Sequence, residues 1–135
     1  MVHAKAQVST EFIVVMSGIF IVIAALVSSN LEILSAHENN VRVTKARDAI
    51  DSIHKAAEHV YMQGEHSKTQ IFVMIPNGVE SITLSDNLIE INLSVSGVTR
   101  NVFRTTRFSI NGTIPIEEGY YWLNIISRGT YVDIE

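Results

Sequence analysis

The sequence predicts an α+β protein, in which a long N-terminal α-helix, first apolar and then amphipathic, precedes a small antiparallel β-sheet or sandwich. Three patterns predict this fold. Residues 12–27 contain no charged side chain and are mostly large and apolar. Between residues 31 and 61 the apolar side chains mostly recur at steps of three and four, which is helical spacing. After Gly64 the apolar residues tend to alternate with polar ones, which is the period of a half-buried strand.

The composition limits the class of protein. A chain of 135 residues has the length of one domain, and 47% hydrophobic with 18% charged residues is enough for a packed core. The formal net charge is -4, so we expect no nucleic-acid partner, because phosphate binding needs clustered lysine and arginine. There are no cysteines, which excludes disulfides, thiolate metal sites and a cysteine nucleophile.

The helix is expected over residues 7–63, with an apolar part for membrane insertion or assembly at 12–30. No proline precedes Pro76, and Gly64 is a suitable C-terminal stop. The uncharged run of residues 12–27 extends over roughly 24 Å at 1.5 Å per residue. A helix that crosses a bilayer usually needs about 20 residues. With its flanking residues the segment can therefore sit in a membrane.

Residues 64–135 are expected to form the β domain, with short strands joined by tight turns. The clearest turn signals are Pro76-Asn77-Gly78, Ser96-Gly97 and Asn111-Gly112, and the last is the best candidate for a type I′ hairpin. Short strands linked in this way predict antiparallel pairing. The expected strands are residues 69–75, 79–84, 88–95, 98–105, 107–110, 113–116, 119–126 and 130–134.

Glu11 stands at the threshold of the apolar run. A carboxylate in that place is costly unless it is paired or reaches the membrane interface. Cleavage between Ala6 and Gln7 would create an α-amine four residues before Glu11. In a stack of identical helices, Glu11 of one subunit could pair with the Gln7 amine of the next. Such a pair would neutralise both charges and fix the axial register of the helices.

The residues around Glu11 resemble a known processing motif. They are similar to the class III signal peptide of archaeal type IV pilin-like proteins, whose signature is Gln-x-Ser-x-Glu-Phe after a small residue and lysine. Ile13 stands where leucine is common, which is a conservative difference. The resemblance covers the first third of the chain, and the β half shares only the general style of the family. The matching residues are Lys5, Ala6, Gln7, Ser9, Glu11 and Phe12.

The resemblance implies a function and a set of partners. A membrane-embedded prepilin peptidase would cut between Ala6 and Gln7, removing a leader of residues 1–6 and retaining the apolar helix. The mature chain would remain inserted in the membrane until a pilus assembly machinery incorporates it into a helical surface filament. Gln7, Glu11 and Phe12 would lie at the contacts between subunits, and the expected role of this extracellular filament is adhesion.

Other functions are compatible with the same sequence. The chain could be a single-pass anchor whose Glu11 simply reaches the interface, or a membrane-tethered β domain that binds a ligand, or a minor pilin. An ordinary secretory signal would instead place its cleavage site after the apolar run, near Ala24-Ala25 or Ser28-Ser29. Motility and uptake remain alternatives to adhesion.

Two sequons mark possible N-glycosylation sites. They are Asn92-Leu93-Ser94, whose asparagine falls on the polar face of its strand, and Asn111-Gly112-Thr113, whose asparagine falls in the predicted turn. Both asparagines are expected to be exposed, as glycosylation requires.

The other polar and aromatic groups favour structural roles. The four residues His54, Glu58, His59 and His66 lack the spacing of a zinc motif, so we expect a solvated helix face and no metal. Tyr120 and Trp122 should share one strand face, with Tyr121 on the other. Core packing is the expected role of this cluster, and a surface used for adhesion or subunit contact is the alternative. Without a phosphate-binding glycine loop or a recognisable catalytic arrangement, we expect neither an enzyme nor a cofactor.

Overall fold

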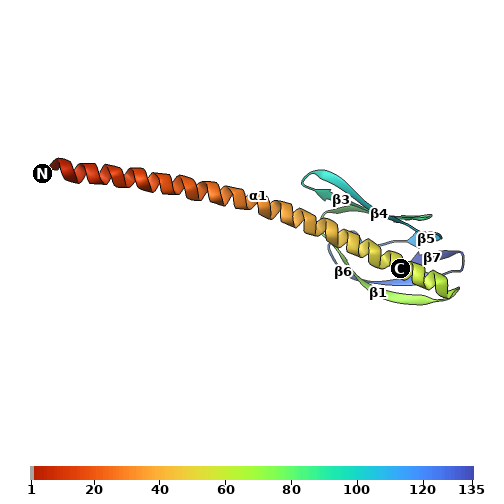
Figure 1. The fold of residues 1–135 in the computed structure, drawn as a ribbon. Coiled ribbons are helices and arrows are strands. Elements are labelled where there is room, and N and C mark those ends of the chain that lie inside the picture. Colours follow the sequence, from red (N-terminus) through yellow and green to blue (C-terminus); the bar gives the residue numbers. More distant parts are fainter. Residues whose placement is uncertain (1) are drawn as a thin grey trace. The chain divides into compact units, whose positions relative to one another are not determined.

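The computed structural model describes the backbone of residues 2–135 and the side chains of residues 10–29, 33 and 37–135. The chain divides into two compact units, Met1–Glu38 and Asn39–Glu135. As predicted, the fold is α+β, with helix α1 (Val2–Gln63) preceding all the strands (Figure 1).

Helix α1 ends where the sequence predicts and begins earlier than expected. Gln63 is its last residue, and Gly64 follows with a φ of 97°, a left-handed conformation that glycine adopts without steric cost. The amide of Gly64 donates to the carbonyl of Tyr61 at 3.2 Å. The helix begins at Val2 rather than at residue 7, which fits the high helix propensity of the alanines and lysine in this lead.

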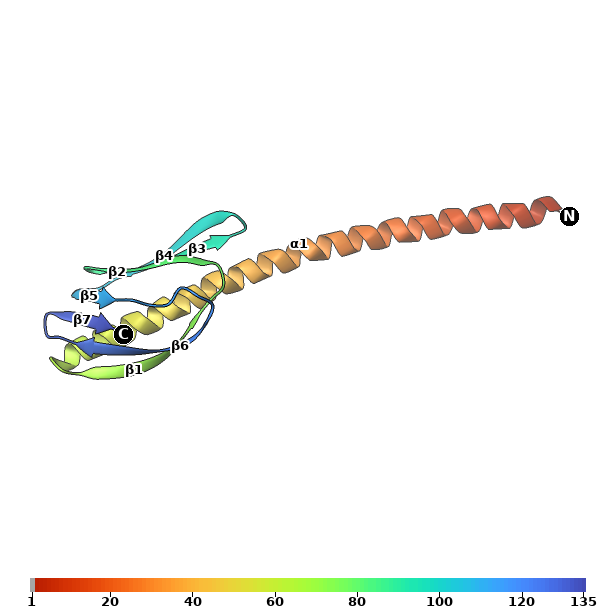
Figure 2. The same ribbon diagram turned by 180° about the vertical axis from the view of Figure 1, so that it is seen from behind.

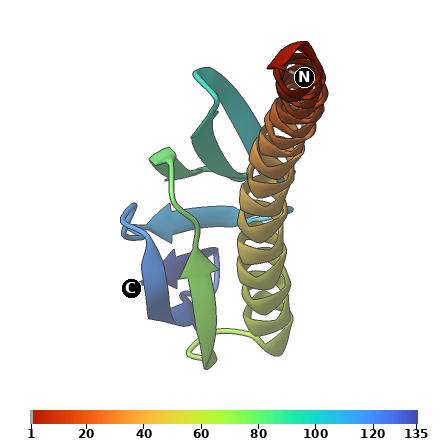
Figure 3. The ribbon, with the colours of Figure 1, turned by 90° about the vertical axis from the view of Figure 1, so that its left-hand side faces the viewer.

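Seven strands form two sheets in the described chain. The order is β1-β6-β7-β5 in the larger sheet and β2-β3-β4 in the smaller one. Both sheets lie on one side of the C-terminal half of α1 (Figure 3), and Figure 2 shows β1 beside β6 in the larger sheet. The strands are β1 (Lys68–Ile75), β2 (Val79–Ser85), β3 (Leu88–Val95), β4 (Val98–Thr105), β5 (Ser109–Gly112), β6 (Gly119–Ser127) and β7 (Tyr131–Ile134).

The predicted hairpin at Ser96-Gly97 is confirmed. Val95 pairs with Val98 across the turn, which makes β3 and β4 antiparallel neighbours. Ser96 and Gly97 have φ values of 52° and 77°, and a type I′ turn requires positive φ at both central residues. The alternation of β3 is also confirmed, because Ile89, Ile91, Leu93 and Val95 are buried and the polar side chains between them are only partly covered.

The predicted hairpin at Asn111-Gly112 is wrong. Both residues lie within β5, residues 113–116 form no strand, and β5 pairs with β7 in parallel, so the sheet is mixed rather than antiparallel. A glycine is needed at position 112 because the backbone of β7 approaches it closely. A Cβ atom at this position would lie 2.1 Å from the carbonyl oxygen of Ile134, and its φ of 132° also favours glycine.

The core forms where one face of α1 meets the inner faces of both sheets. The alanines on this face let the helix approach closely, while larger branched side chains such as Ile50 and Ile53 fill the space between helix and strands. The fully or almost fully buried helix residues are Ala46, Ala49, Ile50, Ile53, Ala57 and Val60.

Two polar contacts also join α1 to the end of β4. The Arg104 guanidinium contacts the Asp51 carboxylate at 2.7 Å, and the His54 ring nitrogen Nε2 lies 3.1 Å from the Thr105 carbonyl oxygen. Because Asp51 and Arg104 are partly exposed, their ion pair contributes little energy and serves mainly to align the helix with the strand.

Shortening a core side chain of α1 should destabilise the β domain. Ile53 is fully buried, so Ile53→Ala should lower the free energy of unfolding by about 2–5 kcal/mol, through lost burial and a residual cavity. Urea titration can follow this through Trp122, which is the sole tryptophan. Met62→Ala is the control on the same helix, because Met62 is 72% exposed and should change stability little. Equal losses in the two variants would contradict the packing described above.

Candidate functional site

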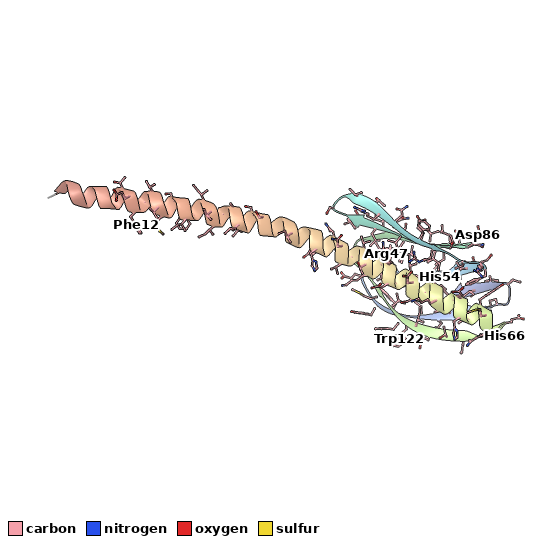
Figure 4. The ribbon with its side chains drawn as sticks, viewed as in Figure 1. Phe12, Arg47, His54, His66, Asp86 and Trp122 are labelled. Carbon is pink, nitrogen blue, oxygen red and sulfur yellow. The ribbon has the colours of Figure 1, made fainter. Side chains whose placement is uncertain are left out.

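The first candidate site is the apolar segment Thr10–Ser29 of α1. By length and composition these 20 residues are able to cross a membrane, and none of them is buried. Apart from the partly covered Met16, their large apolar side chains are exposed, from 47% at Ile19 to 70% at Ile21. Their side chains surround the helix in Figure 4, where Phe12 is labelled. A continuous apolar surface of this size marks contact with lipid or protein.

The serines of this segment are adapted to apolar surroundings. Each hydroxyl donates to the backbone carbonyl four residues earlier, at 2.7 Å from Ser17, 2.9 Å from Ser28 and 3.0 Å from Ser29. A hydroxyl satisfied within its own helix avoids most of the cost of leaving water. These serines therefore do not prevent the segment from entering a bilayer or a bundle of helices.

Glu11 is exposed at the start of the same segment, beside Phe12. Among the residues whose side chains are described, no ion pair involves Glu11. The side chains of Lys5, Ala6 and Gln7 lie outside the described ones. The processing site and the pair between Gln7 and Glu11 therefore stay predictions.

No known protein family, curated protein or solved structure matches this chain. The resemblance to archaeal type IV pilin-like proteins therefore rests on residues 5–12 and on their position before the apolar segment.

The two sequons differ in accessibility. Asn111 is exposed on β5, although it lies in a strand rather than in the predicted turn. The expected exposure is wrong for Asn92, which is partly buried and donates from Nδ2 to the Ser81 hydroxyl at 3.1 Å. Its Oδ1 atom is buried without a hydrogen-bond partner in the described structure. Glycosylation of Asn92 would have to break the contact with Ser81, whereas Asn111 is free of such a constraint.

The expected core position of the late aromatic cluster is wrong for two of its three members. Tyr120 and Trp122 do share one strand face, but they are 64% and 63% exposed. Tyr121 points the other way and packs against the core, where Leu123 and Ile125 of the same strand are buried. The inner side of β6 is thus filled by these residues, which leaves Tyr120 and Trp122 on the outer face.

Phe72 of β1 joins these two rings. The sequence did not predict this contact. Phe72 pairs with Trp122 in the register of β1 and β6, and it is itself 53% exposed. Its ring stacks on Tyr120 at a centroid distance of 5.2 Å and contacts Trp122 at 4.7 Å. The order of the strands in the sheet was the missing information, because β1 and β6 are far apart in the chain.

The histidines singled out in the sequence are not brought together. His54 lies at the contact with Thr105, and the Nε2 atom of His59 is 3.1 Å from the side-chain nitrogen of Gln63. Within the described residues, no group of three or more histidine, aspartate and glutamate side chains could hold a metal ion. His66 has a positive φ of 70° in the turn that follows α1 (Figure 4).

N-linked glycosylation should discriminate between the two sequons. We expect glycopeptides of protein from its native source to carry sugar on Asn111 and not on Asn92, because only Asn111 is exposed without a side-chain partner. Mass spectrometry of the Asn111→Gln variant should show the loss of the glycan mass, and Asn92→Gln, the matched control, should retain it. A glycan found on Asn92 would contradict this assignment.

Proposed function

We propose that this chain is a structural subunit of a surface filament of the archaeal type IV pilin kind, assembling through the apolar segment of α1. One observation carries the proposal. A single helix has two apolar surfaces, of which one is buried by its own β domain and the other, Thr10–Ser29, is left uncovered. The second surface begins at a carboxylate set within a motif that resembles a pilin processing site.

The exposed apolar surface of Thr10–Ser29 needs apolar surroundings. Before assembly, lipid would cover it, as it does any spanning helix. In a filament, the same segments from neighbouring subunits would cover one another. Transfer from lipid to a helix bundle gives little hydrophobic energy, because both surroundings are apolar, so close packing and polar pairs must direct assembly. Repeated head-to-tail contacts that do not close into a ring give an open helical polymer.

Glu11 would supply the directing polar contact. After cleavage at Ala6, the α-amine of Gln7 would be positively charged and would lie at the start of the same helix. A charge surrounded by apolar side chains is stabilised only if it is paired, so Glu11 would favour the one stagger at which it meets the amine of a neighbour. The pair would then determine the axial offset between subunits, while Phe12 and the residues after it would supply the packing.

The β domain would coat the outside of the filament and carry the adhesive role. The pathway would also need a prepilin peptidase and an assembly machinery. The second candidate is a single-pass membrane anchor for the same β domain, favoured by the fact that Thr10–Ser29 alone is long enough to span a bilayer. The two candidates differ in the N-terminus of the mature protein and in the role of Glu11.

The mature protein should begin at Gln7. Edman sequencing or intact mass measurement of the surface-exposed protein tests this, and co-expression with a prepilin peptidase should convert the full chain to the shorter form. Ala6→Trp, which replaces the small residue at the cleavage point, should leave the leader attached. A mature N-terminus at Met1, or near Ser28, would exclude the processing on which the filament proposal depends.

Removal of the carboxylate should separate membrane insertion from assembly. Glu11→Ala should remain in the membrane fraction, because the apolar segment is unchanged, but electron microscopy should show no filaments or at least about tenfold fewer. Glu38→Ala is the matched control, since Glu38 is an exposed carboxylate on the same helix beyond the apolar segment. Normal filaments from the Glu11 variant would overturn the pairing argument and favour the anchor.

A further inference from the structure

The outer face of β1 and β6 combines exposed aromatic rings with polar groups, and neither the helix nor the filament proposal uses it. Phe72, Tyr120 and Trp122 form the aromatic part, here called the aromatic platform. Figure 4 shows Trp122 projecting from the side of the sheet turned away from the C-terminal half of α1. Exposed aromatics that already stack on one another are held in place before any ligand arrives, so binding would order few further torsions.

The residues beside the aromatic platform are hydrogen-bonding groups. Gln70 and Asn124 face each other in the register, two residues along each strand from Phe72 and Trp122, and therefore lie on the same face of the sheet. They line a surface hollow of about 430 Å³, whose other lining residues are Lys68, Thr69, Ile126 and Glu135. This volume lies within the usual range for small-ligand sites, about 300–1,000 Å³.

We propose that this face binds a neutral oligosaccharide of glucose-configured pyranose units. The ring C–H groups of such a sugar form an apolar face, which fits the electron-rich face of an aromatic ring. Its equatorial hydroxyls both donate and accept hydrogen bonds, and the carboxamides of Gln70 and Asn124 also do both. Trp122 contacts Phe72 on one side and keeps most of its surface open, so a sugar can stack on the indole while its hydroxyls reach the hollow.

The size of the aromatic platform favours a small ligand over a second copy of the chain. Three aromatic side chains at about 60% exposure offer roughly 350 Å² of surface. A stable protein interface buries about 800 Å² on each partner. Toward the hollow, the rings are followed by the polar pair and by Lys68 and Glu135, with Ile126 as the one apolar residue of the described lining. With both a lysine and a glutamate at the hollow, a neutral sugar suits it better than a polyanion.

The sugar site would give the proposed adhesive function its class of ligand. Only the biological role of the site rests on the proposed function. Binding itself can be measured on unassembled chains. Loss of binding with normal filaments would overturn the sugar site alone, whereas failure to form filaments with binding intact would overturn only the subunit proposal.

The test uses the full chain in phosphatidylcholine nanodiscs, which avoids sugar-headed detergents. Trp122 is the sole tryptophan, so its fluorescence reports the site directly. Titration with cellotetraose or fully N-acetylated chitotetraose, both neutral, should give a saturable blue shift and should protect Trp122 from quenching by iodide. Mannitol, an open-chain polyol without a pyranose face, should give neither response.

Variants then locate the effect. Phe72→Ala should weaken binding at least about tenfold, as loss of a central aromatic contact does. The double variant Gln70→Ala with Asn124→Ala should weaken it severalfold. Phe103→Ala is the matched control, because Phe103 is 57% exposed on β4 of the other sheet, and it should change affinity less than about twofold.

Three results would overturn the proposal. The first is no saturable response to either tetrasaccharide, and the second is an equal loss of binding in Phe103→Ala. The third is protection of Trp122 from iodide in the absence of sugar, if this protection increases with protein concentration and is lost in Phe72→Ala. That result would identify the aromatic platform as a contact between copies of the chain.

Discussion

Along the C-terminal half of α1, alanines and branched side chains are arranged so that one helix face packs against two sheets at once. Ala46 and Ala57 allow close approach, and Ile50 and Ile53 fill the space between the elements. This contact determines which face of each strand is turned inward. The outward position of Trp122 follows from it, because side chains along β6 alternate between the two faces of the strand and Leu123 is buried on the inner face.

The same helix meets its two surroundings with different chemistry. In the β domain it presents a buried apolar stripe with a polar side, where Asp51 contacts Arg104. In Thr10–Ser29 it is apolar on all sides, and its serines bond to their own backbone. By length and composition this segment is able to cross a membrane, and an exposed apolar helix surface is more favourable in lipid or against other helices than in water. The proposed assembly role of Glu11 depends on such surroundings, since a carboxylate directs contacts strongly only where water is excluded.

The outer face of β1 and β6 carries the aromatic side chains that do not pack into the core. Leu123 and Ile125 occupy the inner side of β6, so the larger rings of Tyr120 and Trp122 remain outside. They do not lie singly, because Phe72 from a strand distant in sequence stacks on Tyr120 and contacts Trp122. Three aromatic groups kept on a solvated surface give up the free energy that burial would provide. That cost is the physical reason for assigning them a ligand rather than a packing role.

The sequence by itself determined the features that depend on neighbouring residues along the chain. These are the apolar segment, the end of α1 at Gly64, most of the strand positions and the turn at Ser96-Gly97, because composition, spacing and turn chemistry act locally. The tertiary structure alone decided the parallel pairing of β5 with β7, which made Gly112 a point of close approach rather than a turn. It also decided the partial burial of Asn92 and the outward position of Trp122. A period of two separates the faces of a strand, but only the neighbouring strands and the helix determine which face is buried.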